Sequence, residues 1–341
     1  MPPVLLSERP TSLVLDPIED TTRRRFITGA GAAALAAAFL AACGDGGSGD
    51  EPEGETRSVD DYFGAVTVPA TPRRVVSADD ATLAAMVVLG APPIASYFNY
   101  TLSEPAYLGE GYQSVENINN GETGEIDFER ALALNPDLMI TMVGVPDNLF
   151  YEELYHRYQA AVPTFGWLRD QRTLDSLRTN FFMVARALDL ESRAVEIFDE
   201  VEERIGELRE RVSKLEEAPR VNFVRVWPDF LHVRFADPVA VLVREIGLEW
   251  GLAPSPDEFA IDISLEQVRL LDEADALFVM VNGGADAAFD QLVAEPLWEQ
   301  VTPVKNQAVH RVPDYWLNGD PTALKLILDD LERLVVAPAE G

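Results

Sequence analysis

Two stretches of this sequence repeat one pattern, and that pattern determines the fold we expect. Residues 126–143 read IDFERALALNPDLMITMV, and residues 263–281 read ISLEQVRLLDEADALFVMV. In each, a polar residue precedes a short helical segment, a glutamate (Glu129 or Glu266) follows two residues later, and an aspartate precedes an apolar run. A short apolar run bounded by turn residues is typical of a buried strand. The pattern therefore predicts a short capped helix followed by a core strand, once in each half of the chain.

Outside these stretches, strands continue to alternate with helices. In the first half we predict strands at 74–77, 94–97, 138–143 and 162–165, with helices at 80–89, 129–134 and 147–161. In the second half we predict strands at 221–226, 276–281 and 309–312, with helices at 238–246 and 321–335. Such alternation indicates α/β units built on mostly parallel sheets. In the second copy of the pattern, Ser264 and Gln267 also fit a capping box.

The middle of the chain has a different character. Residues 173–215 are helical in pattern, with an interruption at 189–191 that predicts two helices. We therefore expect an N-terminal α/β lobe at 61–171, a connecting helix at 172–190 and a C-terminal α/β lobe at 191–341. A crevice between two such lobes is a common place for a small-molecule site.

Composition excludes several classes of function. The 341 residues contain 58 acidic and 27 basic side chains, a formal net charge of −31, which disfavours nucleic-acid binding. The only cysteine is Cys43, so neither an intrachain disulfide nor a thiolate zinc site can form. The three histidines lie far apart in the sequence. No nucleophile elbow or phosphate-binding loop is present, so we do not expect an enzyme.

The N-terminal segment has the features of an export signal. Arg23 and Arg24 precede a short apolar stretch, and the stretch ends in the sequence LAAC at Cys43. A basic region followed by a short apolar run is typical of a signal peptide, and the arginine pair is typical of twin-arginine export. We expect residues 1–43 to be this signal, with Cys43 lipidated in a lipobox, and residues 44–60 to be a disordered linker. The mature chain would then be anchored to the outer face of the cytoplasmic membrane.

The body of the chain resembles the periplasmic binding proteins that bind ferric siderophores, haem or cobalamin. The phrases that carry the resemblance occur in order: GAVTVP at 64–69, PRRVV at 72–76, LGAPP at 89–93, ALNPDLMI at 133–140, ISLE at 263–266, PLW at 296–298, AVHRV at 308–312 and LDDL at 328–331. The resemblance implies two lobes joined by a long rigid helix, the class III arrangement of these proteins. It also implies that the chain is the binding component of an ATP-driven (ABC) importer and acts as a monomer.

Two glutamates acquire a candidate role from this resemblance. On physical grounds alone, each could simply complement the positive end of its own helix, since carboxylates are favourable there. In the family, one glutamate per lobe docks onto arginines of the permease dimer, and those positions match Glu129 and Glu266.

The candidate ligand contacts are arginines and aromatic residues near the predicted carboxyl ends of strands, where ligands of open α/β sheets bind. Arg225 interrupts an apolar strand and needs either a carboxylate or an anionic ligand as its partner. The family often places a ligand-facing arginine there, and an aromatic residue at the place of Trp316. The other candidates are Tyr97, Phe98, Tyr100, Trp167, Arg169, Tyr315, Trp227 and Arg234. Core packing is the alternative for Trp316, and Asp229 or Asp237 could instead pair with Arg225.

Arginines and aromatic rings together suit a bulky, partly anionic ferric chelate. The siderophore already wraps the iron, so the protein needs neither a metal ligand nor an intrinsic cofactor. Cobalamin or haem is the alternative ligand in the same fold, and tyrosines keep open an axial ligand for haem. Binding of a bare metal ion is a second alternative, which would require several histidine or carboxylate ligands that meet between the lobes.

Overall fold

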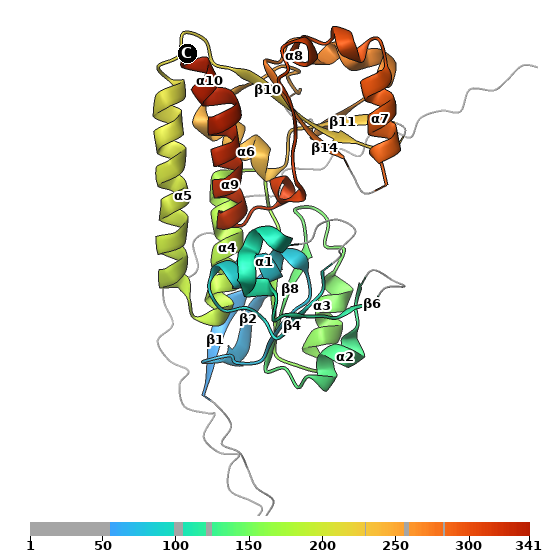
Figure 1. Cartoon of the computed structure of the whole chain (residues 1–341). Helices are drawn as coiled ribbons and strands as arrows, with labels where there is room; N and C mark the ends of the chain where they lie inside the picture. Colours follow the sequence, from blue (N-terminus) through green and yellow to red (C-terminus); the bar gives the residue numbers. More distant parts are fainter. Residues whose placement is uncertain (1–54, 99–104, 121–124, 229, 256–258, 282–283) are drawn as a thin grey trace, which may run out of the picture. The chain divides into compact units, whose positions relative to one another are not determined.

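The two apolar runs of the repeated pattern form central strands of two separate sheets (Figure 1). The computed structural model describes residues 55–98, 105–120, 125–228, 230–255, 259–281 and 284–341. Strand β8 (Leu138–Gly144) is buried along its whole length, and β14 (Ala276–Val281) is buried at all but its last residue. Both predictions of a core strand are confirmed.

The first sheet is parallel throughout and has the strand order β5-β4-β3-β8-β9. Its other strands are β3 (Val75–Ser77), β4 (Ala95–Ser96), β5 (Glu116–Asn117) and β9 (Thr164–Leu168). Its helices are α1 (Asp80–Val88), α2 (Phe128–Ala133) and α3 (Glu152–Gln159). Val75 and Leu138 pack with α1 in one core, whereas Val76 and Met139 pack with α2 and α3 in another. The sheet is therefore covered on both faces.

The second sheet is mixed. Strands β10 (Arg220–Val226), β14 and β15 (Val309–Arg311) are parallel, and β12 (Glu249–Trp250) adds a short parallel pairing to β10. Strands β11 (Leu231–Arg234) and β13 (Ala260–Ile263) continue the sheet in the antiparallel direction. Helices α6 (Pro238–Ile246) and α9 (Pro321–Leu331) share one core with this sheet. The expected α/β class with two mostly parallel sheets is confirmed.

Two consecutive helices, rather than one, stand between the sheets in the sequence. Helix α4 (Leu174–Leu188) ends where Asp189 adopts a left-handed conformation (φ 62°), and α5 (Glu191–Val212) begins two residues later. The break was predicted at this place. Figure 1 shows α5 as the longest helix, beside α4, α6 and α9. The long helix is thus α5, which the sequence analysis had assigned to the C-terminal lobe.

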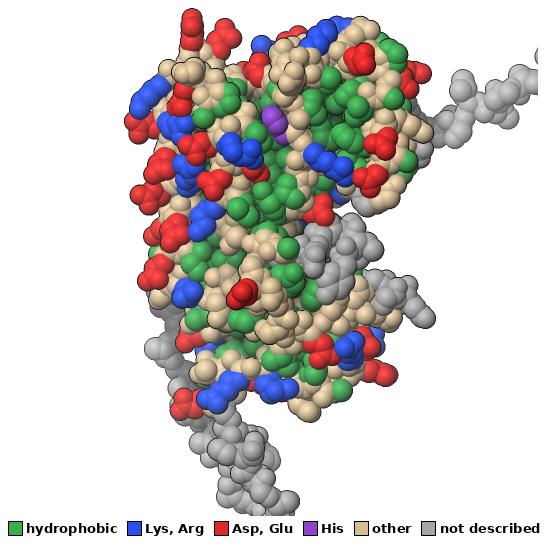
Figure 2. Space-filling model, viewed as in Figure 1, with side chains coloured by type: hydrophobic (Ala, Val, Ile, Leu, Met, Phe, Trp, Pro, Cys, Tyr) green, Lys and Arg blue, Asp and Glu red, His purple; other side chains and the backbone are tan. Residues whose placement is uncertain are grey.

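The charged face of α5 is organised by ion pairs. Arg204 and Arg211 both bind Glu332, and Arg211 also holds Glu340, so α5 is tied to the C-terminal segment. Figure 2 shows acidic and basic side chains alternating along this edge of the molecule. The charged side chains of α5 therefore form a solvated surface of paired acids and bases.

An antiparallel hairpin precedes the first sheet, formed by β1 (Thr56–Asp61) and β2 (Gly64–Pro69). The buried carboxylate of Asp61 accepts hydrogen bonds from the Tyr155 hydroxyl (2.7 Å) and the Gly166 N–H (3.0 Å). The Arg57 guanidinium donates to the carbonyls of Arg186 and Ala187 at the end of α4. The prediction that residues 44–60 form a linker is therefore wrong for residues 56–60, since these contacts fix them to the body.

Other differences concern short elements. The helix predicted at 147–161 begins only at Glu152, after a bridge between Val145 and Asn148. Strands β11, β12 and β13 were not predicted. The remaining elements are η1 (Pro105–Tyr112), β6 (Asn119–Asn120), β7 (Glu125–Ile126), η2 (Leu265–Leu271), α7 (Asp286–Ala294), η3 (Trp298–Gln300), α8 (Thr302–Lys305), η4 (Asp314–Leu317), η5 (Glu332–Val336) and α10 (Ala337–Ala339). In the described residues, no helix combines the length and apolar character that crossing a bilayer requires.

The aspartates of the repeated pattern have matching structural roles. Asp137 accepts hydrogen bonds from the backbone N–H groups of Arg73 (2.8 Å) and Arg74 (2.9 Å), just before β3. Asp275 accepts one from the N–H of Arg220 (2.7 Å), the first residue of β10. In both sheets, the aspartate before one strand secures the beginning of the parallel neighbour. The aspartates of the repeat therefore belong to the fold.

Candidate functional site

The carboxyl end of β10 brings together three of the predicted ligand contacts. The Arg225 guanidinium lies over the Trp227 ring, 5.4 Å from its centroid. Trp227 is 38% exposed and stacks with Phe230 at a centroid distance of 6.1 Å. Register explains this placement, because residues two apart on a strand point to the same face. An exposed aromatic ring beside a cation is suited to an anionic, partly apolar ligand.

Arg234 lies on the neighbouring strand β11, close enough to Arg225 to act on its charge, and pairs with an aspartate of the protein. Its guanidinium donates two hydrogen bonds, at 2.8 and 2.7 Å, to the buried carboxylate of Asp237, and these bonds raise the pKa of Arg234. His232 lies between Arg234 and Asp262, with its Nε2 3.2 Å from the Arg234 Nη1. Burial lowers the pKa of Arg225, while Asp237 and Asp314 nearby favour its charged form. The site therefore carries two arginines, and Arg234 is paired with the Asp237 carboxylate.

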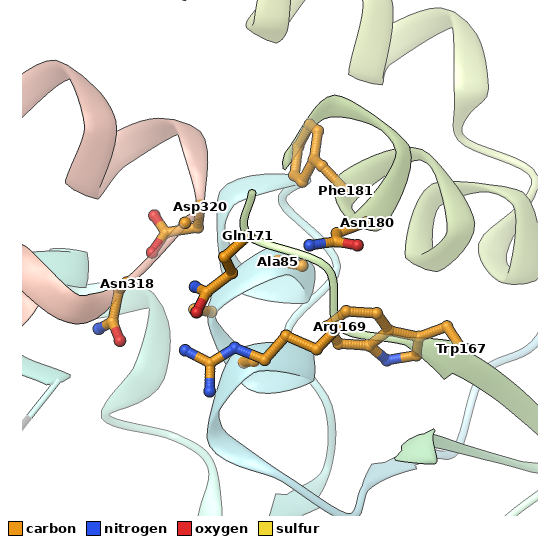
Figure 3. Close-up of a pocket in the computed structure, with 11 residues that line it drawn as sticks. Ala85, Trp167, Arg169, Gln171, Asn180, Phe181, Asn318 and Asp320 are labelled. Carbon is orange, nitrogen blue, oxygen red and sulfur yellow. The ribbon is translucent and has the colours of Figure 1, made fainter. Parts of the chain in front are cut away.

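A pocket lies between elements of the two halves, and Figure 3 shows it. Its volume is about 410 Å³ including the part open to solvent, and it includes the predicted residues Trp167 and Arg169. Trp167 is almost wholly buried, and its indole N–H donates to the Thr82 hydroxyl (2.8 Å). Arg169 points into the pocket and donates to the carbonyl of Leu317 (3.2 Å). The remaining polar lining comes from Gln171, Asn180, Asn318 and Asp320.

A second pocket lies at the carboxyl edge of the first sheet. It has a volume of about 450 Å³ including open solvent, and Tyr97 is the predicted residue that lines it. Asp79 and Asp80 directly follow β3, and Tyr151 and Tyr158 reach the pocket from the segment of α3. These four residues were not among the predicted ligand contacts. The carboxyl-end rule could have identified both aspartates, because they come within three residues of the strand predicted at 74–77.

Two of the predicted ligand contacts have buried side chains. Trp316 has no exposed surface, packs against Phe223 and Phe278, and donates its indole N–H to Asp330 (3.2 Å). Phe98 is 3% exposed and packs in a small core below α1. For Trp316, these contacts favour core packing, the alternative named above.

Tyr315 lies in the contact between the two halves. Its hydroxyl donates to Asp330 (2.7 Å), and its ring lies 5.8 Å from that of Tyr107. Tyr107 in turn donates to Asp320 (2.7 Å) and accepts from the Asn318 amide (3.0 Å). Burial and the neighbouring Asp320 raise the pKa of Tyr107, which keeps its hydroxyl a donor. These bonds tie η1 to the segment that precedes α9.

The two glutamates of the repeated pattern are exposed. Glu129 lies in the first turn of α2, after the Asp127 cap, and Glu266 lies in the first turn of η2. The predicted capping box forms there, with the Ser264 N–H donating to the Gln267 side chain (3.0 Å). Within the described residues, neither glutamate carboxylate has an ion-pair or hydrogen-bond partner. Both could therefore accept an external cation.

Four predicted residues lie outside the described part of the chain: Tyr100, Cys43, Arg23 and Arg24. In the part that is described, no three histidine, cysteine or carboxylate side chains gather in a way that could hold a metal ion.

Comparison with known proteins identifies the family. Residues 75–315 match the family described as periplasmic binding protein. The chain belongs to this family. It is similar to the Fe(3+)-citrate-binding protein YfmC of Bacillus subtilis (strain 168), with 25% identity over 77% of this chain and 80% of that protein. It is also similar to the probable siderophore-binding lipoprotein YfiY of the same organism, with 23% identity over 87% and 94%.

A solved structure agrees with the fold. The siderophore periplasmic binding protein from the fuscachelin gene cluster of Thermobifida fusca superposes with a TM-score of 0.67 and 20% identity, over 80% of this chain and 98% of that one. The likeness supports the class III two-lobed arrangement. The family and the fold are those of binding proteins.

Proposed function

We propose that this protein captures a ferric-siderophore complex outside the cytoplasm and delivers it to the permease of an ABC importer, without catalysing a reaction. The observation that carries the proposal is the edge of the second sheet, where Arg225 and the exposed Trp227 lie together beside Arg234. A ferric chelate presents the electron-rich oxygen atoms of its carboxylate, catecholate or hydroxamate groups together with apolar surface, and both are met there. The names of the relatives, which refer to the binding of ferric citrate and of siderophores, support the same class of ligand.

The proposal can be tested by tryptophan fluorescence of the soluble body. Trp227 is exposed, whereas Trp167, Trp298 and Trp316 are buried, so Trp227 should report on binding. Ferric hydroxamates and ferric catecholates should quench the emission at micromolar concentrations or below. Arg225→Gln should weaken that binding about tenfold or more, since a charge-assisted hydrogen bond is lost. The matched control is Arg209→Gln, an exposed arginine of α5. Quenching by haem or cobalamin alone would refute the proposal.

We propose further that Glu129 and Glu266 dock onto arginines of a permease dimer. Their exposure, their equivalent positions and their lack of partners among the described residues support this role. Two carboxylates at a fixed separation form a charge-assisted contact whose fit depends on the geometry of both halves.

We also propose the route by which the protein reaches its site of action. Residues 1–43 act as a twin-arginine export signal through Arg23 and Arg24, and lipidation of Cys43 anchors a monomeric body to the outer face of the cytoplasmic membrane. The lipobox pattern in the sequence supports the anchor. The relative YfiY is itself named as a probable siderophore-binding lipoprotein. We keep the division into lobes at 61–171 and 191–341, joined by a connecting helix at 172–190, as part of this proposal.

A further inference from the structure

The pocket at the carboxyl edge of the first sheet has a distinctive chemistry. Ten of the described residues line it: Ala78, Asp79, Asp80, Tyr97, Ile126, Thr141, Met142, Tyr151, Leu154 and Tyr158. Two of these are carboxylates and three are tyrosines, and this described lining contains no lysine, arginine or histidine. The pocket is therefore acidic and aromatic at the same time.

Asp79 supplies a buried negative charge to this pocket. Its carboxylate accepts hydrogen bonds from the N–H groups of Thr82 and Met142, both at 2.7 Å, and from the Thr82 hydroxyl at 2.9 Å. All three donors are neutral. Burial raises the pKa of Asp79 to about 6, with Asp80 nearby adding to the increase. At neutral pH the group is mostly ionised, and a cation that entered the pocket would stabilise it.

Asp80 supplies a second, accessible carboxylate. It is exposed in the first turn of α1, and no ion pair or hydrogen bond engages its side chain within the described residues. The aromatic part of the lining comes from Tyr97, Tyr151 and Tyr158. Aromatic faces attract cations through their quadrupole, and a carboxylate beside them strengthens that attraction. Rings and carboxylates in one pocket are suited to an ammonium group.

The second sheet has the opposite polarity at its carboxyl edge. Arg225, Arg234 and Trp227 lie there, whereas the pocket of the first sheet contains carboxylates. A ferric centre surrounded by electron-rich oxygen ligands would be recognised by the arginines. A cationic group on the same ligand would suit the acidic pocket.

We propose that the pocket formed by Asp79, Asp80, Tyr97, Tyr151 and Tyr158 binds a positively charged amine of the ligand, so that the cargo is a ferric chelate with a free ammonium group. This inference rests on the proposed function, because the cargo is the same ferric chelate. It narrows that cargo to chelates with a cationic arm.

The test compares two forms of one ligand. A linear ferric trihydroxamate that ends in a primary amine, and the same chelate N-acetylated at that amine, are titrated into the wild type, Asp80→Asn and Asp175→Asn. Asp175 is the matched control, since it is also an exposed aspartate in the first turn of a helix, α4, and it does not line the pocket. The wild type should bind the amine form about three to ten times more tightly than the acetylated form. Asp80→Asn should remove that preference, and Asp175→Asn should retain it.

The outcomes separate this inference from the function on which it rests. The proposal of an amine pocket would be overturned if the wild type bound both forms with equal affinity. It would also be overturned if Asp80→Asn lowered the affinity for both forms equally. Either result would leave ferric-chelate binding intact. If neither chelate binds, the cargo is not this ferric trihydroxamate, the proposed function is decided by the fluorescence titration above, and n-butylammonium tests the pocket alone by saturation-transfer NMR in constant salt. An amine site would be supported if the saturation-transfer signal of n-butylammonium weakened in Asp80→Asn but not in Asp175→Asn. It would be refuted if that signal were absent, or if Asp80→Asn left it unchanged.

Discussion

At the scale of the residue, Asp79 allows a direct test of buried hydrogen bonding. Donors face both of its oxygens, from Thr82 on one side and from Met142 and the Thr82 hydroxyl on the other. In Asp79→Asn, one oxygen becomes an NH₂ group that meets a donor, so a buried N–H loses its acceptor. We expect the free energy of unfolding at pH 7 to fall by about 1–3 kcal/mol, measured by urea denaturation. The exposed control Asp290→Asn should change it by less than about 0.5 kcal/mol.

The same variant has an expected pH dependence. Because burial raises the pKa of Asp79 from 3.8 to about 6, its protonated form stabilises the folded state. That contribution is complete below pH 3.8 and is lost as the pH rises through about 6. The difference in stability between the wild type and Asp79→Asn should therefore shrink from pH 4 to pH 7. A difference that grows over this range would show that desolvation does not dominate at this carboxyl.

Some features of the site could be predicted from local sequence patterns, and others could not. Arg225 and Trp227 were correctly placed at the edge of a strand, because strand periodicity and the carboxyl-end rule are local properties of the sequence. The burial of Trp316 could not be predicted in this way, since a polar loop surrounds it in sequence while Phe223 and Phe278 enclose it in space. Burial of one side chain depends on contacts between distant segments, and no local pattern reports them.

At the scale of the element, the paired aspartates predict equal effects in the two sheets. Asp137 secures the residues before β3, and Asp275 secures the start of β10. We expect Asp137→Ala and Asp275→Ala each to lower the free energy of unfolding by about 1–2 kcal/mol, because each leaves strand N–H groups without their acceptor. The effects should add within about 0.5 kcal/mol in the double variant, since the two sites share no partners. Asp290→Ala is the surface control. A neutral Asp275→Ala would contradict the equivalence of the two sheets.

The elements themselves divide into those that local patterns specify and those that they do not. The break at Asp189 and the end of α6 at Gly247 (φ 85°) were predicted, because interrupted periodicity and a glycine both mark helix ends. Strands β11 and β13 were missed, since each has four residues and their pairing joins segments about 30 residues apart. The hairpin of β1 and β2 was partly assigned to a linker, although Asp61 and Arg57 fix it through distant partners.

At the scale of the whole molecule, hydrogen bonds across the two halves favour a fixed arrangement. Tyr107 donates to Asp320, and Arg169 donates to the carbonyl of Leu317, so segments about 150 to 210 residues apart are joined directly. The ion pairs of Arg204 and Arg211 with Glu332 secure α5 to the end of the chain. A body held in this way keeps the separation of distant surface groups nearly constant, and the proposed docking of Glu129 and Glu266 depends on that separation.

This arrangement predicts that ligand capture and delivery can be separated by mutation. The double variant Glu129→Ala with Glu266→Ala removes two exposed carboxylates without touching any residue that lines the pockets or the Arg225 edge. Ligand affinity should therefore stay within about twofold of the wild type, whereas uptake of iron-labelled ligand by cells should fall about tenfold or more, because both charge-assisted contacts to the permease are lost. The control removes the exposed glutamates Glu153 and Glu249, one from each half, which changes the net charge equally. If uptake is unchanged in the first double variant, or falls equally in the second, the two glutamates do not form the docking contact. The acidic surface would then act only through its overall charge.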